Sequence, residues 1–196
     1  MAVDINISGQ YLQNGVPIGG GGASGIHGFV KQQSGDSVSS SINSTATNTL
    51  GTATNRLYAN AFIPAQTITC SSLYMNCSTL ASGVFGRILI YSNLNGLPDT
   101  KLYESADLDL STTGIKTATT TFTFTAGTTY WLSFHASGAA TIQSIGTGSV
   151  IPVRVFGISF YSLYIATIAP PFGSAPSPFG AVSGTNTSVP FIGITI

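Results

Sequence analysis

The chain has 196 residues, which is enough for one domain with a sizeable core or for a domain with a short arm. Only 6% of its residues are charged, against about 25% in an average domain, and six cationic and six anionic residues give a net charge of zero. This composition excludes a charge-rich disordered chain, a coiled coil with charged flanking positions, and a nucleic-acid binder that uses a basic patch.

Hydroxyl residues take the place of charges in this sequence. Hydrophobic residues make up 43%, and the chain contains 25 Ser and 25 Thr. These values favour an all-β protein whose polar surface consists of hydroxyl and amide groups. Because small monomers usually stay soluble through charge, we expect much of the surface to be buried in an assembly. A monomer covered by Thr, Ser and Asn remains the alternative.

Residues 1–25 are predicted to form an N-terminal docking arm with a glycine hinge. Ile5 and Ile7 alternate with polar residues, as in a short strand. The Asn14-Gly15 pair lies between apolar residues, which is typical of a hairpin turn. Four glycines at 19–22 end this pattern, and residues 26–55 are predicted to be an extended Ser/Thr-rich connector.

From residue 56 onward, short strands follow one another, and no segment has a sustained helical period. Strands are expected at 57–63, 67–75, 84–91, 117–125, 128–135, 150–158, 159–168 and 189–196, and loops at 93–99 and 169–188. The strand at 84–91 is apolar except for Arg87, so we expect it to be buried on both faces. Along 117–125, Phe122 and Phe124 should point inward. Residues 56–196 are thus predicted to be a single jelly-roll-like antiparallel β-sandwich.

The two cysteines, Cys70 and Cys77, match no zinc or redox spacing. We expect two small buried thiols rather than a disulfide, and on one straight strand the two would lie on opposite faces. The N-terminus shows no leader pattern, and no apolar run reaches the roughly 18 residues of a membrane span. The sequence therefore predicts synthesis in the cytoplasm without export through a leader.

Residues suited to catalysis or metal binding are few. Ser133 and His135 would share a strand face, but neighbours two residues apart are poorly placed for proton transfer, so a polar or core histidine is expected. Four of the six acids lie close together in sequence: Asp99, Glu104, Asp107 and Asp109. Asp107 and Asp109 suit a weak metal site, yet their alternation with leucines is typical of a plain strand. We therefore expect no enzymatic activity, cofactor or metal.

Aromatic residues are frequent in the last third of the chain. Four of them are candidate contacts for a glycan or another subunit: Tyr161, Tyr164, Phe172 and Phe179. Exposed rings beside Asn and Thr can stack on sugars, whereas buried rings belong to a core or a subunit interface. The core or interface interpretation is favoured.

Several segments together resemble a known group of proteins. They are 86–98 (GRILIYSNLNGLP), 102–105 (LYES), 113–116 (TGIK) and 124–132 (FTAGTTYWL). They are similar to a β-sandwich module of tailed-bacteriophage fibre and decoration proteins, and the resemblance covers roughly residues 56–158. Residues 7–18 (ISGQYLQNGVPI), followed by glycines, resemble phage fibre segments that lead into a trimeric head.

The resemblance implies a non-enzymatic homotrimeric protein of the virion's outer surface. Large fibres carry a large anchoring domain, whereas only about 25 residues are available here, which suits a capsid decoration (cement) protein or short head fibre. The arm would grip other virion proteins through Ile5, Ile7, Tyr11, Leu12, Val16 and Ile18. The alternatives are a tail-fibre or baseplate protein that binds host surface glycans and, outside virions, a soluble lectin. Neither nucleic acid nor a membrane is an expected partner.

Overall fold

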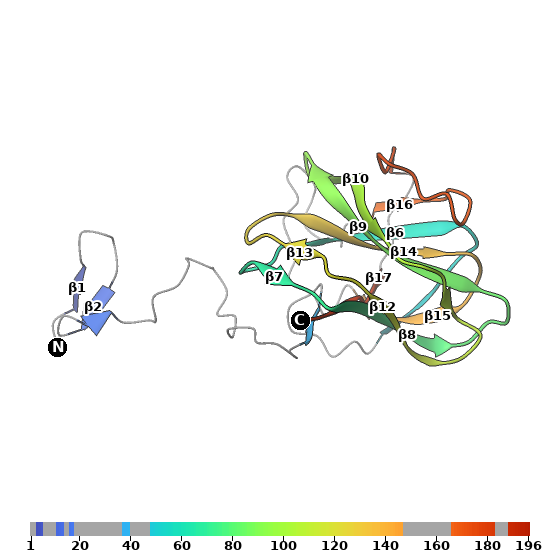
Figure 1. Ribbon diagram of the computed structural model, residues 1–196, viewed down its shortest axis with the longest axis horizontal. Coiled ribbons are helices and arrows are strands. Elements are labelled where there is room, and N and C mark those ends of the chain that lie inside the picture. Colours follow the sequence, from blue (N-terminus) through green and yellow to red (C-terminus); the bar gives the residue numbers. More distant parts are fainter. Residues whose placement is uncertain are drawn as a thin grey trace. The chain divides into compact units, whose positions relative to one another are not determined.

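The computed structural model describes residues 48–146, 166–182 and 188–196, together with short strands at 3–5, 11–13, 16–17 and 37–39. The chain divides into two compact units, Met1–Lys31 and Gln32–Ile196. All regular structure in the described residues is β-strand, and every strand pairing is antiparallel (Figure 1). The expected all-β class is confirmed over these ranges.

The first large sheet, named here the β9 sheet, has the order β10-β9-β14-β6-β16, and β11 also pairs with β9. Its strands are β6 (Arg56–Phe62), β9 (Phe85–Leu94), β10 (Leu97–Glu104), β11 (Leu108–Asp109), β14 (Tyr130–Ala136) and β16 (Ala166–Ile168). The pairings of β14 with β6 and with β9 run through seven residues without a shift in register, so the three central strands form a continuous platform.

The second large sheet, named the β8 sheet, has the order β17-β15-β8-β18-β4, with β12 on β8 and β5 on β15. Its strands are β4 (Ser37–Ser39), β5 (Asn48–Gly51), β8 (Ser72–Thr79), β12 (Gly114–Thr119), β15 (Thr141–Gly146), β17 (Ser188–Pro190) and β18 (Gly193–Thr195). A separate two-stranded piece consists of β7 (Ile68–Thr69) and β13 (Thr123–Phe124).

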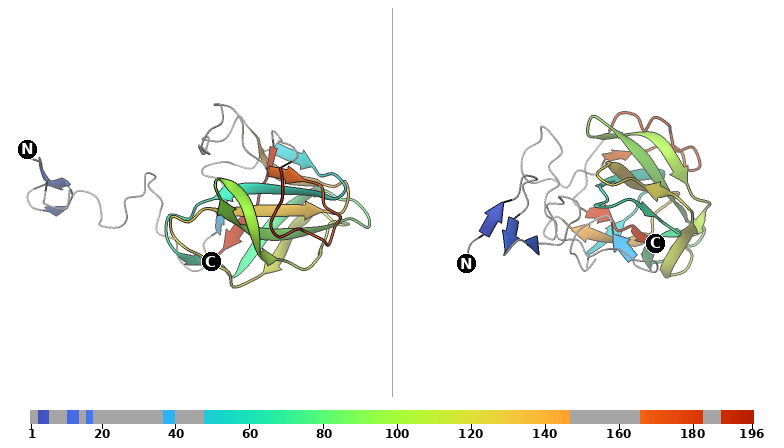
Figure 2. Two further views of the ribbon diagram at one scale, coloured as in Figure 1. Left: turned by 90° about the horizontal axis from the view of Figure 1, so that it is seen from above. Right: turned by 60° about the vertical axis from the view of Figure 1, so that its left-hand side comes forward.

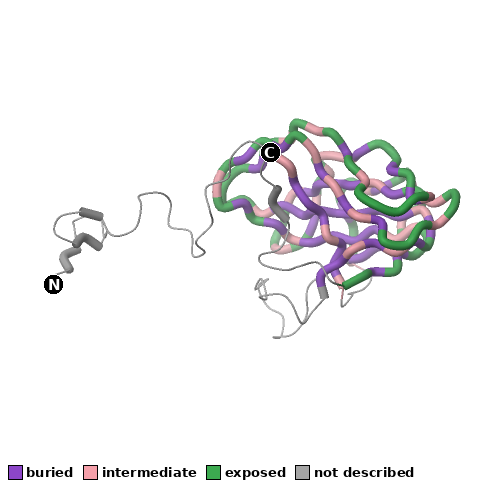
Figure 3. Tube along the Cα trace, turned by 90° about the horizontal axis from the view of Figure 1, so that it is seen from below, coloured by how far each residue is buried: buried purple, intermediate pink, exposed green. Residues whose placement is uncertain are grey.

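The two sheets face each other across one apolar interior, named the inner cluster (Figure 2). The β9 sheet contributes side chains such as Ile88 and Phe134, and the β8 sheet contributes Leu73, Met75 and Ile194. Alternate residues of β8 point into this interior, which is the pattern of a strand with one buried face. Figure 3 shows buried stretches running through the middle of the sandwich and exposed stretches mainly at its periphery. The arrangement is a β-sandwich-like fold of two curled sheets.

The expected strand at 84–91 is confirmed as β9, and both of its faces are buried. Ile88 and Ile90 belong to the inner cluster, while Leu89 and Tyr91 lie on the opposite face of the sheet. That opposite face is covered by the chain itself, so the apolar strand by itself requires no second subunit.

The expected loop at 93–99 is wrong, because the chain forms a tight hairpin there. Leu94 pairs with Leu97, and the two residues between them, Asn95 and Gly96, have φ angles of 52° and 83°. Two consecutive positive φ values are the signature of a type I′ turn, whose twist matches that of the flanking strands. The strands β9 and β10 therefore continue up to the turn.

Two expected strands, at 67–75 and 117–125, are each interrupted in the structure. The breaks lie opposite each other, since Cys70 N donates to Phe122 O at 2.9 Å and Thr120 N donates to Ser71 O at 3.2 Å. The shared break sends β7 and β13 away from the β8 sheet. It also changes the alternation, so both Cys70 and Cys77 point into the inner cluster as free thiols. The expectation of buried thiols is confirmed, and the opposite-face geometry does not apply because it was expected only for one straight strand.

The end of the chain and the connector also differ in part from expectation. The strand expected at 189–196 appears as β17 and β18, and Ile192, Ile194 and Ile196 all contact the inner cluster. Within the expected connector 26–55, β4 pairs with β18 and β5 pairs with β15. Part of the connector therefore belongs to the β8 sheet. The expected strands at 150–158 and 159–168 lie outside the described residues, apart from β16.

Candidate functional site

A proline-rich segment, residues 169–182, lies on the outer face of the β9 sheet and is named here the strap. It follows β16 and is coloured orange to red in Figure 1, on the side of the β9 sheet away from β8 and β12. Ala175 and Phe179 of the strap are buried in a second apolar cluster, named the outer cluster. Its members are Leu57, Ala59, Leu89, Tyr91, Trp131, Ile168, Ala175 and Phe179.

Hydrogen bonds fix the strap to the central and edge strands. The Tyr91 hydroxyl donates to Pro176 O at 2.9 Å, and the Phe179 ring meets the Tyr91 ring edge-on at 5.1 Å between centroids. Lys101 forms two ties, because its Nζ donates to Ala175 O at 3.0 Å and its backbone N donates to Ser177 Oγ at 3.0 Å. The covered face is therefore held by polar as well as apolar contacts.

Four of the few charged residues gather beside the strap. Arg87 pairs with Glu104 at 2.9 Å and with Asp107 at 2.5 Å, and Lys101 pairs with Glu104 at 2.6 Å. Burial opposes ionisation of Glu104, but hydrogen bonds from Lys101 and Arg87 outweigh it and lower the pKa of this carboxyl group. The hydrogen bonds to Asp107 and Glu104 raise the pKa of Arg87. The guanidinium carbon of Arg87 lies 5.2 Å from the centroid of the Phe172 ring, which is a cation–π contact with the strap.

His135 lies under the start of the strap and is fully buried. Its Nε2 lies 3.2 Å from Pro170 O, its ring centroid lies 5.1 Å from that of Phe172, and its Nδ1 has no hydrogen-bond partner. Desolvation by burial lowers the pKa of His135, which favours the neutral ring.

Ser133 and His135 share this covered face, as expected for residues two apart on β14. The Ser133 hydroxyl donates to Trp131 O at 3.4 Å, and both side chains are inaccessible to solvent. A pair in this position cannot reach an external substrate.

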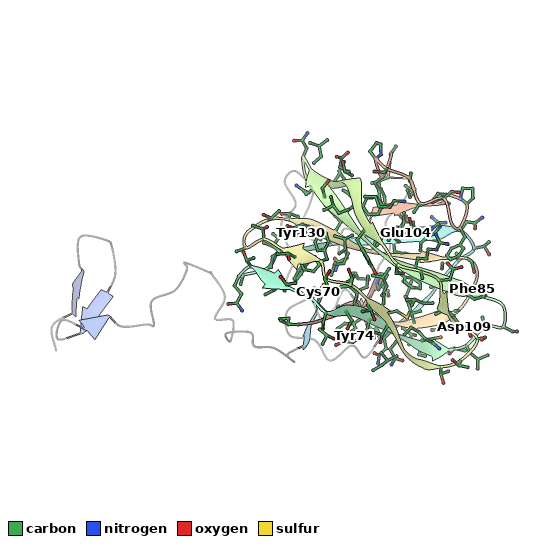
Figure 4. All side chains as sticks on the ribbon, viewed as in Figure 1. Cys70, Tyr74, Phe85, Glu104, Asp109 and Tyr130 are labelled. Carbon is green, nitrogen blue, oxygen red and sulfur yellow. The ribbon has the colours of Figure 1, made fainter. Side chains whose placement is uncertain are left out.

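The four clustered acids do not converge on one point. Asp109 accepts hydrogen bonds from the backbone N and hydroxyl of Ser111, and Asp99 accepts one from the Thr100 hydroxyl. In Figure 4 Glu104 and Asp109 lie apart, with Asp109 near Phe85. Among the described residues, no group of three or more His, Cys, Asp or Glu side chains is arranged to hold a metal ion.

The four aromatic candidates have different positions. Phe179 has an exposed fraction of only 1% and packs in the outer cluster, which agrees with the favoured core interpretation and leaves the ring out of reach of a glycan or another subunit in the folded chain. Phe172 is half-buried against Arg87 and His135. Tyr161 and Tyr164 lie outside the described residues.

Sequence reasoning did not identify Tyr91, Lys101 and Glu104 as residues that hold the strap. One feature of the sequence could have indicated these residues. The chain has only twelve charged residues, and four of them lie within one short stretch: Arg87, Lys101, Glu104 and Asp107. Their partners are backbone carbonyls and a ring more than 65 residues away, and no local pattern reveals such partners.

The N-terminal arm contains a small sheet of its own, in the order β1-β2-β3. The strands are β1 (Val3–Ile5), β2 (Tyr11–Gln13) and β3 (Val16–Pro17). Gln13 pairs with Val16, which confirms the expected hairpin between β2 and β3, while Asn14 and Gly15 themselves lie outside the described residues. Among the expected docking residues, Ile5, Tyr11, Leu12 and Val16 fall in these strands, whereas Ile7 and Ile18 lie outside the described residues.

No family model matches this sequence, and a comparison with curated proteins gives no match. In the described part of the chain there is no helix of the length and hydropathy needed to cross a bilayer. The functional assignment therefore rests on the residues and on their arrangement.

Proposed function

We propose that this chain is a non-enzymatic structural protein of the outer surface of a bacteriophage virion. In this proposal it is a homotrimeric capsid decoration or short head-fibre protein with a jelly-roll-like sandwich, and it is made in the host cytoplasm. Its partners are its own copies and the capsid proteins to which the arm binds.

The observation that carries the proposal is the separate arm. Met1–Lys31 is a compact unit of its own, and its strands have only three, three and two residues. A sheet of this size cannot compensate for the backbone ordering cost of about 1–2 kcal/mol per residue, so it needs another surface for stability. Docking on a virion protein by strand addition supplies such a surface.

The resemblance to phage surface proteins supports the same proposal. Its segment 86–98 spans most of β9, the hairpin turn and the start of β10, and its segment 124–132 runs from the end of β13 through a turn into the first part of β14, which pairs with β9. The short segments 102–105 and 113–116 fall on the end of β10 and the start of β12. Most of the similar residues thus lie in strands of the sandwich, and the others lie in the turns and the short loop that adjoin these strands.

A tail-fibre or baseplate protein that binds host glycans is the second candidate. It would rely on the aromatic residues of the last third, of which Phe179, a residue of the strap, is buried in the outer cluster. The decoration role is therefore proposed first.

The test is a truncated chain that lacks residues 1–22. Because β4 and β5 begin after this point, the sandwich keeps all its strands, and we expect normal folding by circular dichroism. We expect virions assembled with the truncated protein to lack it, as judged by gel analysis of purified particles.

A pair of point variants provides the matched control. Leu12→Asp places a charge in β2 of the arm and should abolish incorporation, whereas Thr117→Asp changes an exposed polar side chain of β12 in the sandwich and should not. Full occupancy of particles by the truncated chain would contradict arm docking. A large drop in its melting temperature would instead identify the arm as an integral part of the sandwich.

A further inference from the structure

The strap covers the single tryptophan of the chain. Trp131 is fully buried in the outer cluster together with Ala175 and Phe179 of the strap, and its Nε1 donates to Asn93 Oδ1 at 3.0 Å. The emission of this one indole therefore reports whether the strap is in place.

The strap can separate from the sheet without disruption of the main core. The inner cluster contains no residue from 169–182, and the strap's buried side chains belong to the outer cluster alone. On its two sides the chain is held by β16, which pairs with β6, and by β17, which pairs with β15. A segment with this contact distribution opens as a local unit.

Glu104 positions both cations that contact the strap. Its Oε2 accepts from Lys101 Nζ, which also donates to Ala175 O, and its Oε1 accepts from Arg87, which lies against Phe172. Protonation of Glu104 removes the charge that holds these two side chains in place. The lowered pKa of Glu104 means that this loss occurs as pH falls below its ordinary value of 4.5.

Protonation of His135 weakens the covered state as pH falls, as protonation of Glu104 does. The charged groups that face His135 are Arg87 from β9 and Lys101 and Glu104 from β10. Asp107 acts on it through its ion pair with Arg87. The neighbour of His135 on β6, Leu57, and all residues of the strap are uncharged. The pKa of His135 is lowered from 6.5, mainly by burial. A histidine that binds its proton less readily when covered favours the covered state above pH 6.5, and that contribution is lost as pH falls below this value.

We propose that the strap is an acid-released cover of the outer face of the β9 sheet, held in place at neutral pH by the Glu104 ion pairs and by neutral His135. Acid lifts residues 169–182 and exposes Trp131 while the two sheets stay folded. This inference does not depend on the virion role.

The experiment follows the full-length chain from about pH 7.5 to about pH 2.5, a range that spans the ordinary pKa values of His and Glu and extends lower because the pKa of Glu104 is lowered. Trp131 emission and its quenching by acrylamide are recorded beside far-ultraviolet circular dichroism. We expect a shift of the emission to longer wavelength and a several-fold rise in quenching, with the sheet signal unchanged.

Three variants distinguish the contribution of Glu104 protonation from that of His135 protonation. Glu104→Gln weakens the hold on Lys101 and Arg87 at every pH, so the emission midpoint should move to higher pH. His135→Gln keeps a donor for Pro170 O but does not titrate, so the midpoint should move to lower pH. The control Asp109→Asn changes an exposed carboxylate that also has a lowered pKa but bonds to Ser111, and its midpoint should equal that of the unmodified chain.

Three outcomes overturn the proposal. The first is constant emission across the range while the sheet signal persists. The second is a shared midpoint for emission and circular dichroism, which is global acid unfolding. The third is the same midpoint in Glu104→Gln, His135→Gln and the unmodified chain.

Discussion

Gly86 illustrates how a single residue sets the spacing of the inner cluster. It lies in β9, and a Cβ atom added at this position would overlap the ring tip of Phe134, whose side chain is fully buried. A ring packed in the core cannot move aside without a change in its neighbours. The absence of a side chain at position 86 is therefore required by the packing, although the backbone there has no positive φ.

We expect Gly86→Ala to destabilise the protein by about 1–3 kcal/mol, the usual cost of an extra methyl group in a tight core. Gly51→Ala is the matched control, because Gly51 also lies in a strand and has no atom within 4 Å of the added Cβ. Urea unfolding measures both variants. Equal stability of the two would contradict this account, and Phe134→Leu should reduce the cost of Gly86→Ala in a double-mutant cycle.

At the scale of elements, β12 is an edge of the β8 sheet, because among the described strands it pairs with β8 alone. Its register places Lys116 opposite Met75, in the row that faces the inner cluster, and Lys116 Nζ donates to Thr112 Oγ1 at 2.6 Å. An inward charge on an edge strand is a common device against pairing with another chain. Lys116 thus protects a six-residue edge whose other residues are uncharged, two of them Thr and one Ile.

We expect Lys116→Val to produce species larger than those of the unmodified protein, increasingly so at higher concentration. The control Thr117→Val adds the same side chain to the other face of β12 and keeps the lysine. Light scattering of the two variants across a concentration series makes the comparison. Identical scattering would show that the lysine does not protect this edge.

Much of the strand layout could be predicted from local patterns, and the errors have a common physical origin. The apolar run around Ile88 and the Asn14-Gly15 turn carry their own signals, so β9 and the β2–β3 hairpin were found. Alternation along 117–125 reports which side chains are exposed but not which strand is the partner. The break at 120–122 lies opposite the break at Cys70 and Ser71 in the neighbouring segment. It can be seen only when the pairing of the two segments is known.

The contacts of the candidate site were even harder to predict from local sequence patterns than the strand pairings. The expected aromatic contacts were chosen by residue type, and burial placed Phe179 in a core that it shares with Tyr91. The strap is held by the Lys101 ammonium on the Ala175 carbonyl, and a backbone acceptor has no sequence signature. Polar pairing with a distant main chain is thus the part of the fold that composition and periodicity cannot predict.

For the whole molecule, the central question is what covers the remaining apolar surface. Seven large hydrophobic side chains are exposed in the described chain: Ile63, Leu80, Phe85, Leu94, Leu97, Leu102 and Ile115. Their exposed fractions run from 39% to 67%, on a protein with no net charge to keep its copies apart. Uncharged proteins with exposed apolar groups tend to associate.

We expect this association to be a specific trimer. The strap already covers the outer face of the β9 sheet, so the surface left for subunit contacts includes the exposed leucines at the β9–β10 hairpin and on β10. Sedimentation equilibrium of the purified full chain at micromolar concentration should give about three times the 20.1 kDa of one chain. The same mass should persist in high salt, because apolar contacts are not screened by ions whereas ion pairs are. A single species of 20.1 kDa at every concentration would contradict the trimer and favour a monomer covered by hydroxyl groups.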